Sequence, residues 1–381
     1  MTPEAALLRN GGLVAVPTET VYGLCADASN PEAIRRVFTV KGRDEGKPLP
    51  VLVSGPEDAA RLCEASPKVL TVIRRFWPGP LTLVLPLKSG VLPPSVTGGL
   101  TTVGLRCSAH PLTLALLKEV GTPLVLTSAN LSGQPEPTSA EDVTIPVDAV
   151  LDGGRSNVGR PSHVLDLSLA RPEILRYGAL TIGLTGGSGA GKSAVLRRLS
   201  ELGCHTINAD EVYGRLLDND PDMRDMLFGR FPAIFPARKS LPDRVKLRGL
   251  VFHDPEALAA LNAITHPFVL REIRRELASL VLREGLTVPV AVEAIALIES
   301  GFSKMCGVTL GVTAPEEDRI SRIAARDGLT RSDVLLRIKS QPPDSFYRER
   351  CTEIIENIGS ESELRNKVDT FWEKYSSERG K

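Results

Sequence analysis

A run of glycines and small residues in the second half of the chain indicates phosphate chemistry. Residues 186–193 fit the pattern G-x-x-x-x-G-K-S/T and stand between an apolar stretch and an amphipathic one. Glycines let successive backbone N–H groups point at phosphate oxygens, and the start of a helix adds its positive end. We therefore predict a nucleotide site, with Lys192 on the β- and γ-phosphates and the hydroxyl of Ser193 on Mg²⁺. The predicted nucleotide-binding residues are Gly186, Gly187, Ser188, Gly189, Ala190, Gly191, Lys192 and Ser193.

A carboxylate and a row of arginines follow this loop. One helix and one short strand separate Asp210 from the loop, which places Asp210 at the carboxyl edge of the predicted sheet. A carboxylate there can accept a proton from an acceptor hydroxyl or hold Mg²⁺, although it also suits the N-cap of a helix over 211–217. Arg319, Arg322 and Arg326 have the spacing of one helical face. That spacing suits a lid over a transferring phosphate, with a solvated basic face as the alternative.

The first half of the chain carries dispersed cations and hydroxyls instead of one motif. Lys41, Arg43 and Lys47 fall within seven residues, and Arg106 ends an apolar stretch. Residues 127–133 form a loop of small residues directly after another apolar stretch. Such groups bind anions and suit a polyphosphate, although a solvated turn also explains the segment KGRDEGK.

The composition excludes several classes of protein. The 381 residues carry 46 basic and 46 acidic side chains, so we exclude a uniformly basic protein that coats nucleic acid. Hydrophobic residues make up 42% of the chain, which is enough for a core in each of two domains. We expect a cytoplasmic protein without membrane contact, because the sequence shows neither a long apolar run nor a secretion signal. The six scattered cysteines lack a C-x-x-C pair and are expected to be free thiols.

Strands and helices are interleaved along the whole chain, which indicates the α/β class. We predict two domains, residues 1–179 and 180–381. Thr330 is expected to cap a helix, and the apolar stripe of the last helix is expected to pack in a core. Strands are expected at 13–16, 50–53, 82–86, 103–106, 123–128, 180–184, 206–207, 288–294 and 309–312. Helices are expected at 33–40, 67–76, 111–120, 192–202, 315–326, 331–339 and 363–375.

Six segments of the second half occur in a fixed order along residues 181–360. They are LTGGSGAGKS, LGCHTINAD, LNAITHPFV, VEAIALIESG, RIAARDGLT and IIEN. In these segments the chain resembles the dephospho-CoA kinase family. The resemblance implies a P-loop kinase core with a parallel sheet, a CoA-binding helical region and a lid. It also implies transfer of a phosphate from ATP, with Mg²⁺, to the ribose 3′-hydroxyl of dephospho-CoA, which is the last step of CoA biosynthesis.

The same resemblance implies roles for single residues of the second half. Asp210 would be the base that takes the hydroxyl proton, and Asn357 would lie near the adenine of ATP. The catalytic residues would be Lys192, Asp210, Arg322 and Arg326. The CoA-binding region would include Arg244, Arg248 and His266.

The chain departs from the kinase family at two positions. The family usually has an aspartate where this chain has Asn208, and a lysine where it has Ala296. An amide can form hydrogen bonds but cannot take up a proton. We expect these departures to bear on the catalytic rate and not on the fold, and another small-molecule kinase is the alternative function.

Seven segments of the first half are also kept in order, over residues 4–178. They are VPTETVYGLCADA, FTVKGRDEGKPLPVLV, RFWPGPLTLVL, VGLRCSAHP, TSANLSG, PSHVLDLS and ILRYGA. Here the chain resembles the YrdC-like threonylcarbamoyl-AMP synthase family. The resemblance implies a twisted, open α/β sheet. It also implies that L-threonine, bicarbonate and ATP are joined into threonylcarbamoyl-adenylate, with release of pyrophosphate, to supply the t6A modification of tRNA.

Residue roles in the first half follow from this resemblance alone. Thr18, Thr20 and Ser162 would lie at threonine, and Arg106 would meet the threonine carboxylate. Arg176 would contact ATP. The triphosphate would be held by Lys41, Arg43 and Lys47, the adenylate by Thr102, and the rest of the nucleotide by Ser128, Asn130 and Ser132.

The resemblances predict a fusion of two ATP-using enzymes. In the synthase, charge builds on phosphate oxygens, so fixed cations are expected to carry catalysis. His163 stands where the family differs, and we interpret it as a packing residue. The implied partners are tRNA or the proteins that transfer the threonylcarbamoyl group, and a first half that binds RNA without catalysis is the alternative.

Overall fold

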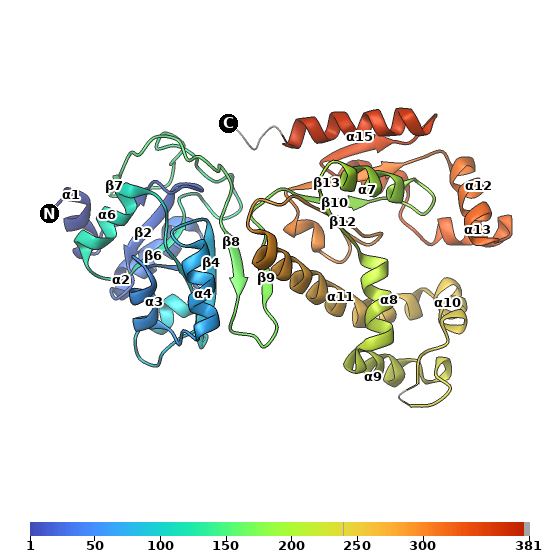
Figure 1. Ribbon diagram of the computed structural model, residues 1–381, viewed down its shortest axis with the longest axis horizontal. Coiled ribbons are helices and arrows are strands. Elements are labelled where there is room, and N and C mark those ends of the chain that lie inside the picture. The colour runs from blue at the N-terminus through green and yellow to red at the C-terminus, as the bar shows by residue number, and fades with distance from the viewer. Residues whose placement is uncertain (239, 377–381) are drawn as a thin grey trace. The chain divides into compact units, whose positions relative to one another are not determined.

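The computed structural model describes residues 1–238 and 240–376 (Figure 1). The chain divides into two compact units. Among the described residues, the first consists of Met1–Gly178 and Leu277–Leu286, and the second of Ala179–Glu276 and residues 287–376. No helix of the described residues is long and apolar enough to cross a membrane.

A mixed nine-stranded sheet forms the centre of the first unit. Its strand order is β7-β1-β2-β6-β3-β5-β4-β8-β9. Neighbours are parallel in the pairs β1–β7, β3–β5 and β4–β8, and antiparallel elsewhere. The strands are β1 (Val14–Val16), β2 (Gly23–Asp27), β3 (Val51–Leu52), β4 (Leu81–Pro86), β5 (Thr102–Arg106), β6 (Leu124–Ser128), β7 (Ala149–Val150), β8 (His163–Asp166) and β9 (Glu173–Arg176).

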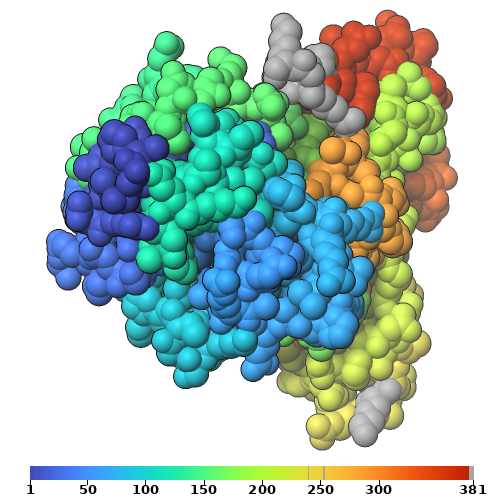
Figure 2. Space-filling model, turned by 60° about the vertical axis from the view of Figure 1, so that its left-hand side comes forward, coloured from blue at the N-terminus to red at the C-terminus, as the bar shows by residue number. Residues whose placement is uncertain are grey.

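Each helix of residues 1–178 begins at a proline. Proline suits this position because its fixed φ matches the helix and its missing N–H would have had no helical partner. The helices are α1 (Pro3–Arg9), α2 (Pro31–Lys41), α3 (Pro56–Leu62), α4 (Pro67–Phe76), α5 (Pro94–Thr97) and α6 (Pro111–Val120). Helices α1 and α6 lie side by side on the surface (Figure 2) and share a buried cluster that includes Leu8, Leu117 and Cys25 of β2.

The second unit is built on a sheet whose five strands are all parallel. The strand order is β11-β12-β10-β13-β14. Because parallel strands end at one edge, the residues after β10, β11, β12 and β13 meet at that edge. The strands are β10 (Thr181–Thr185), β11 (His205–Asn208), β12 (Val290–Glu293), β13 (Val308–Thr313) and β14 (Glu353–Glu356).

Helices pack against this parallel sheet. Helix α15 packs with α7 on a core that contains Leu364, Val368 and Phe371, which confirms the stripe predicted for the last helix. Helices α12 and α13 share a small separate core that includes Ile323 and Val334. The α-helices are α7 (Lys192–Glu201), α8 (Ala209–Asn219), α9 (Pro221–Arg230), α10 (Arg244–His253), α11 (Pro255–Glu284), α12 (Glu316–Asp327), α13 (Arg331–Lys339), α14 (Asp344–Arg350) and α15 (Glu361–Ser376). Short 3₁₀ helices lie at Pro232–Ile234 and Phe302–Met305.

The predicted α/β class is confirmed, and most predicted elements are found within a few residues of their expected bounds. The Thr330 hydroxyl caps α13 by accepting the N–H of Asp333, as expected. The cap of α8 is Asn208 and not Asp210, because the Asn208 side chain reaches the N–H groups of Asp210 and Glu211. Strand β2 was not predicted, since its sequence GLCAD is buried throughout and does not alternate. All six cysteines are free, and four are buried.

Candidate active sites

The phosphate loop of the second unit joins the end of β10 to the start of α7. Gly186, Gly189 and Gly191 have φ values of 137°, 77° and 108°, in the region that favours glycine. A Cβ at Gly186 would clash with the carbonyl oxygen of Val312, and one at Gly191 with the side chain of Asn357. The backbone therefore needs glycine at these positions to make the turn.

Lys192 is the first residue of α7, and its side chain is 6% exposed. The ammonium group donates to the carbonyl oxygens of Gly186 at 2.9 Å and Gly187 at 3.2 Å. Burial lowers the pKa of Lys192 to about 8, although the carboxylates of Glu293 and Asp210 oppose that shift. The loop carbonyl oxygens thus hold the lysine in place beside a cavity that it lines.

A cavity of about 440 Å³ opens in front of this loop. The predicted residues Lys192, Ser193, Asp210, Arg322 and Arg326 all line it. Arg322 donates to the carbonyl oxygen of Gly189 at 3.2 Å. The structure therefore brings the phosphate loop, the carboxylate and two arginines of α12 around one space.

Two further charged residues of this cavity were not predicted from the sequence. Arg337 of α13 lines it and pairs with Asp327 at 2.7 Å, and Asp327 also holds Arg326 at 2.8 Å. Glu293, at the end of β12, also lines it and is 8% exposed. An acidic residue that ends a buried strand beside a phosphate loop was a signal for Glu293. Nothing in its spacing singled out Arg337.

Glu293 is linked to the unusual Asn208. The Asn208 Oδ1 atom accepts the N–H groups of α8, while its Nδ2 donates to Glu293 Oε2 at 3.3 Å. Burial raises the pKa of Glu293, and the Lys192 ammonium opposes that shift. An amide at position 208 therefore supplies a hydrogen bond where a second carboxylate would repel Glu293.

A second cavity of about 300 Å³ lies beside the first. Asp210 and Ile295 line both cavities. His266 also lines the second cavity, and burial lowers its pKa. Ala296 lies in its wall as well. The remaining wall is largely apolar and includes Leu258, Leu261, Val269, Leu270, Ile273 and Phe302.

The other residues predicted for the CoA region lie elsewhere. Arg244 is exposed and pairs with Asp218 at 2.6 Å, and Arg248 is exposed on the same helix. Neither residue is among those that line the second cavity. Asn357 is buried behind the phosphate loop, where its Nδ2 donates to the carbonyl oxygen of Ala190 at 2.8 Å.

Two more side chains hold the phosphate loop. Arg319 of α12 donates from Nε to the carbonyl oxygen of Ser188 at 2.9 Å. Gln341 accepts the Ser188 N–H at 2.8 Å and donates to the Ser188 hydroxyl at 2.7 Å. The part of the chain that contains α12 and α13 is thereby attached to the loop.

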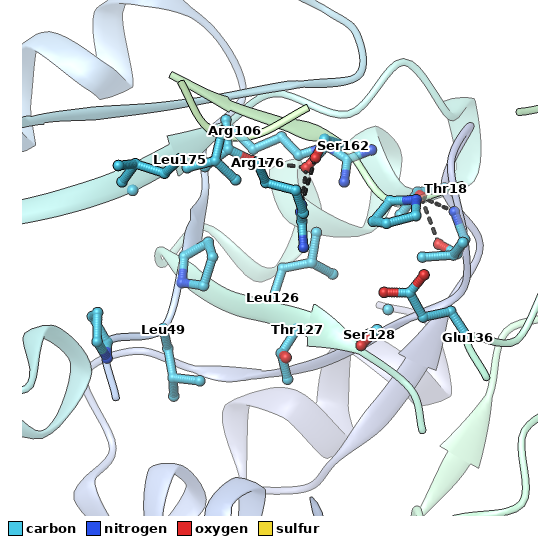
Figure 3. Close-up of a pocket in the computed structure, with 18 of the residues that line it drawn as sticks. Thr18, Leu49, Arg106, Leu126, Thr127, Ser128, Glu136, Ser162, Leu175 and Arg176 are labelled. Atoms are coloured by element: carbon cyan, nitrogen blue, oxygen red, sulfur yellow. Dashed lines mark hydrogen bonds between the residues drawn. The ribbon is translucent and has the colours of Figure 1, made fainter. Parts of the chain in front are cut away.

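The first unit has its own cavity, with a volume of about 310 Å³ (Figure 3). Its walls come from loops and from strands β4, β5, β6, β8 and β9. The predicted residues that line it are Thr18, Arg43, Arg106, Ser128, Ser162 and Arg176. The structure thus gathers residues that are up to 158 positions apart in the sequence (Thr18 to Arg176).

Arg106 is 5% exposed and held from one side. Its Nη2 donates to Glu19 Oε1 at 2.8 Å and to the Thr20 hydroxyl at 2.7 Å. Burial raises the pKa of Glu19, but the charge of Arg106 and a hydrogen bond from Ser108 outweigh this effect. The pKa of Glu19 is therefore below its usual value. The buried Nε of Arg106 has no hydrogen-bond partner among the described residues. Arg106 is therefore fixed in position with a donor to spare.

Arg176 and Ser162 form a second fixed group. Arg176 donates from Nε to the Ser162 carbonyl oxygen at 2.7 Å and from Nη2 to the Ser162 hydroxyl at 2.9 Å. The same hydroxyl lies 3.0 Å from the hydroxyl of Thr82. On this side too, hydrogen bonds set the orientation of a cation and a hydroxyl.

Lys41 is buried beneath the loop that follows β6. Its ammonium donates to the carbonyl oxygens of Ser128 and Asn130 and, at 3.3 Å, to Asn130 Oδ1. Burial and the nearby Arg43 lower the pKa of Lys41 to about 8. In this structure Lys41 and Asn130 thus hold the loop, and neither is among the residues that line the cavity.

Four other predicted residues of the first unit also lie outside the cavity lining. Thr20 is buried behind Arg106, and Thr102 begins β5. Lys47 and Ser132 are exposed. One charged residue of the lining, Glu136, was not predicted, because nothing in the sequence singles out a lone acidic residue in a loop of small residues.

His163 is packed rather than presented to the cavity. Its ring lies edge-on to Tyr177, with centroids 4.9 Å apart. Its Nδ1 accepts the Gly178 N–H at 3.1 Å, and burial lowers its pKa to about 4. Among the described residues, no group of three or more histidine, cysteine, aspartate or glutamate side chains is placed to hold a metal ion.

The chain thus contains two α/β units, each with a cavity lined by cationic side chains. Comparisons with known proteins assign a family to each unit. The Sua5_yciO_yrdC family model, whose description is "Telomere recombination", matches residues 6–178, and the "Dephospho-CoA kinase" model matches residues 180–363. The chain therefore belongs to the threonylcarbamoyl-AMP synthase family through its first part and to the dephospho-CoA kinase family through its second.

Individual relatives match each part. The Threonylcarbamoyl-AMP synthase of Bacillus subtilis is 46% identical over 46% of this chain and 53% of its own length, so the chain spans about half of that relative. The Threonylcarbamoyl-AMP synthase of Thiobacillus denitrificans is 41% identical over 44% of this chain and 90% of its own length. The Dephospho-CoA kinase of Thermus thermophilus is 38% identical over 49% of this chain and 86% of its own length.

Proposed function

We propose that the second unit transfers the γ-phosphate of ATP to the 3′-hydroxyl of dephospho-CoA. The observation that carries this proposal is the place of Asp210, which lines both the cavity at the phosphate loop and the neighbouring, largely apolar cavity. A carboxylate between a donor site and an acceptor site is where a base for the acceptor hydroxyl is needed. Family membership supports the same reaction.

The residues of the phosphate cavity have separate roles in phosphoryl transfer. The loop N–H groups and Lys192 hold the β- and γ-phosphates, and Asp210 takes the proton of the acceptor hydroxyl. Arg322 and Arg326 face the same space and stabilise charge on the transferring group. Mg²⁺ fits this cavity because oxygen donors of Ser193, Asp210 and Glu293 line it, and the bound ion would neutralise phosphate charge.

We propose that the first unit joins L-threonine, bicarbonate and ATP into threonylcarbamoyl-adenylate and releases pyrophosphate. The supporting observation is the set of guanidinium groups around its cavity, contributed by Arg43, Arg106 and Arg176. The buried Nε atoms of Arg43 and Arg106 have no hydrogen-bond partner among the described residues. Donors already in place and not yet bonded are suited to a carboxylate and to phosphate oxygens.

The setting of both reactions is part of the proposal. The threonylcarbamoyl group would pass to tRNA, directly or through transfer proteins. The free cysteines support a reducing compartment such as the cytoplasm.

The test is a parallel assay of the intact chain for both products. Formation of CoA is measured with ATP and dephospho-CoA against a panel of nucleosides and sugars. Pyrophosphate release is measured with ATP and with threonine and bicarbonate present or omitted. Activity on another acceptor would replace the kinase proposal. Binding of tRNA without threonine-dependent pyrophosphate release would replace the synthase proposal by an RNA-binding role.

A further inference from the structure

Glu136 is the single carboxylate among the described residues that line the cavity of the first unit. It lies in the loop after β6, and its side chain points into the cavity (Figure 3). The other charged residues of the lining are Arg43, Arg106 and Arg176. A site for phosphate alone would be weakened by a carboxylate, because like charges repel. The position of Glu136 therefore points to a positively charged part of a ligand.

Threonine brings such a group, since it is a zwitterion at neutral pH. Its carboxylate is matched by the spare Nε donor of Arg106, and its ammonium needs an anion in the same cavity. Glu19 does not serve, because Arg106, Ser108 and the Ala109 N–H already engage its oxygens. Thr18, which lines the same cavity, provides a hydroxyl nearby.

The amino group must also lose a proton before it can act. An ammonium nitrogen has no lone pair, whereas the reaction forms a bond from this nitrogen to the carbon of bicarbonate. Burial raises the pKa of Glu136, and Arg176 and Lys41 lower it by a smaller effect. A carboxylate with a raised pKa is a better proton acceptor at neutral pH than an exposed one.

Building on the proposed synthase activity, we propose that Glu136 binds the ammonium group of threonine and takes up one of its protons. The carboxylate becomes a carboxylic acid and the ammonium becomes a neutral amine. The amine nitrogen attacks the carbon of bicarbonate, a C–N bond forms, a C–O bond breaks and water leaves. A carbamate oxygen then attacks the α-phosphate of ATP, and pyrophosphate leaves.

Four cations surround this step and affect its pH dependence. Arg176 on β9 and Lys41 at the end of α2 act on Glu136 directly, while Arg43 and Arg106 line the same cavity. The arginines stay charged throughout the working pH range. The rate is therefore expected to fall as the pH falls through the pKa of Glu136, since the protonated acid cannot accept a proton.

The test compares Glu136→Gln with the intact full-length chain, and follows threonylcarbamoyl-adenylate and pyrophosphate as a function of pH. The expected kcat at neutral pH is about 10²- to 10⁴-fold lower, with a higher KM for threonine. The rate of the variant should rise by about tenfold per pH unit, as hydroxide deprotonates the amine instead. Glu136→Asp should recover part of the rate. Glu141→Gln, which changes an exposed glutamate in the same region, is the matched control.

Three results would overturn the proposal. An unchanged kcat and pH profile in Glu136→Gln excludes proton transfer, even if the KM for threonine rises. If the glutamine variant does not fold, which its thermal unfolding reports, the same finding in Glu136→Ala would overturn the proposal. A wild-type chain that makes no threonylcarbamoyl-adenylate, while its kinase half is active, removes the synthase proposal and this inference with it.

Discussion

The cavity at the phosphate loop of the second unit and the cavity of the first unit are lined in different ways. In the second unit the cavity is lined by residues that are close together in one loop at the start of α7, namely Ser188, Gly189, Gly191, Lys192 and Ser193. In the first unit they are side chains brought together from positions as distant as Thr18 and Arg176. A backbone cradle can be recognised in any chain that contains its glycines. A cradle of side chains exists only once the sheet has formed.

The cations of the two cavities also differ in their state. Lys192 donates two of its three ammonium N–H groups to the carbonyl oxygens of its own loop. Arg106 is anchored by Glu19 and Thr20 through one nitrogen and keeps its Nε unpartnered among the described residues. The first cavity is therefore organised before its ligands bind, which lowers the reorganisation needed in the reaction.

The largest effect is expected from Lys192→Ala. Loss of the only lysine of the phosphate loop should reduce CoA formation by more than about 10³-fold, because its charge lies on the transferring phosphate. Threonylcarbamoyl-adenylate synthesis should persist at the wild-type rate. Both products are measured on one preparation. Equal loss of both activities in a folded protein would show that the two sites depend on each other.

Asp210→Asn should lower the rate of the kinase by about 10²- to 10⁴-fold, which is the usual range for a general base. The amide keeps the size of the side chain that lines both cavities, so the affinity for ATP and dephospho-CoA should change little. Single-turnover kinetics with equilibrium binding separates the two effects. A variant that loses binding but not turnover would assign Asp210 to substrate binding alone.

Arg43→Ala should reduce threonine-dependent pyrophosphate release by at least about tenfold, or roughly 1.4 kcal/mol of transition-state free energy. The guanidinium lines the cavity and has a buried Nε without a partner among the described residues. The kinase should be unaffected. Lys68→Ala is the matched control, since Lys68 is exposed and outside the lining. Similar losses in the two variants would remove the distinction between lining and surface cations.

The smallest effect is expected from Asn208→Asp. The change replaces the donor to Glu293 with a carboxylate, so the pKa of Glu293 should rise further. Without Mg²⁺ the free energy of unfolding should fall by about 1 kcal/mol. The added carboxylate should lower the Mg²⁺ concentration required, with a change in kcat of less than about threefold. If the wild-type chain is inactive and the Asn208→Asp variant is active, the second unit of the wild-type chain only binds its substrates.

The features that depend on neighbouring residues could be predicted from the amino-acid sequence. The phosphate loop, the helix that follows it and the cap of α13 at Thr330 were all predicted, because each is set by φ angles and hydrogen bonds within a few residues. The interleaving of strands and helices likewise predicted the α/β class. The ordered segments of each half predicted the two families.

Which polar side chains share a cavity depends on the folded arrangement of distant segments. Lys41 and Lys47 stand six residues apart, yet one is buried under a loop and the other is exposed, because the helix ends between them. Glu136 had no local pattern to mark it, and it became part of a site through the packing of distant strands and loops. Charge, burial and distance between such residues are set by long-range contacts, and these do not follow from spacing along the chain.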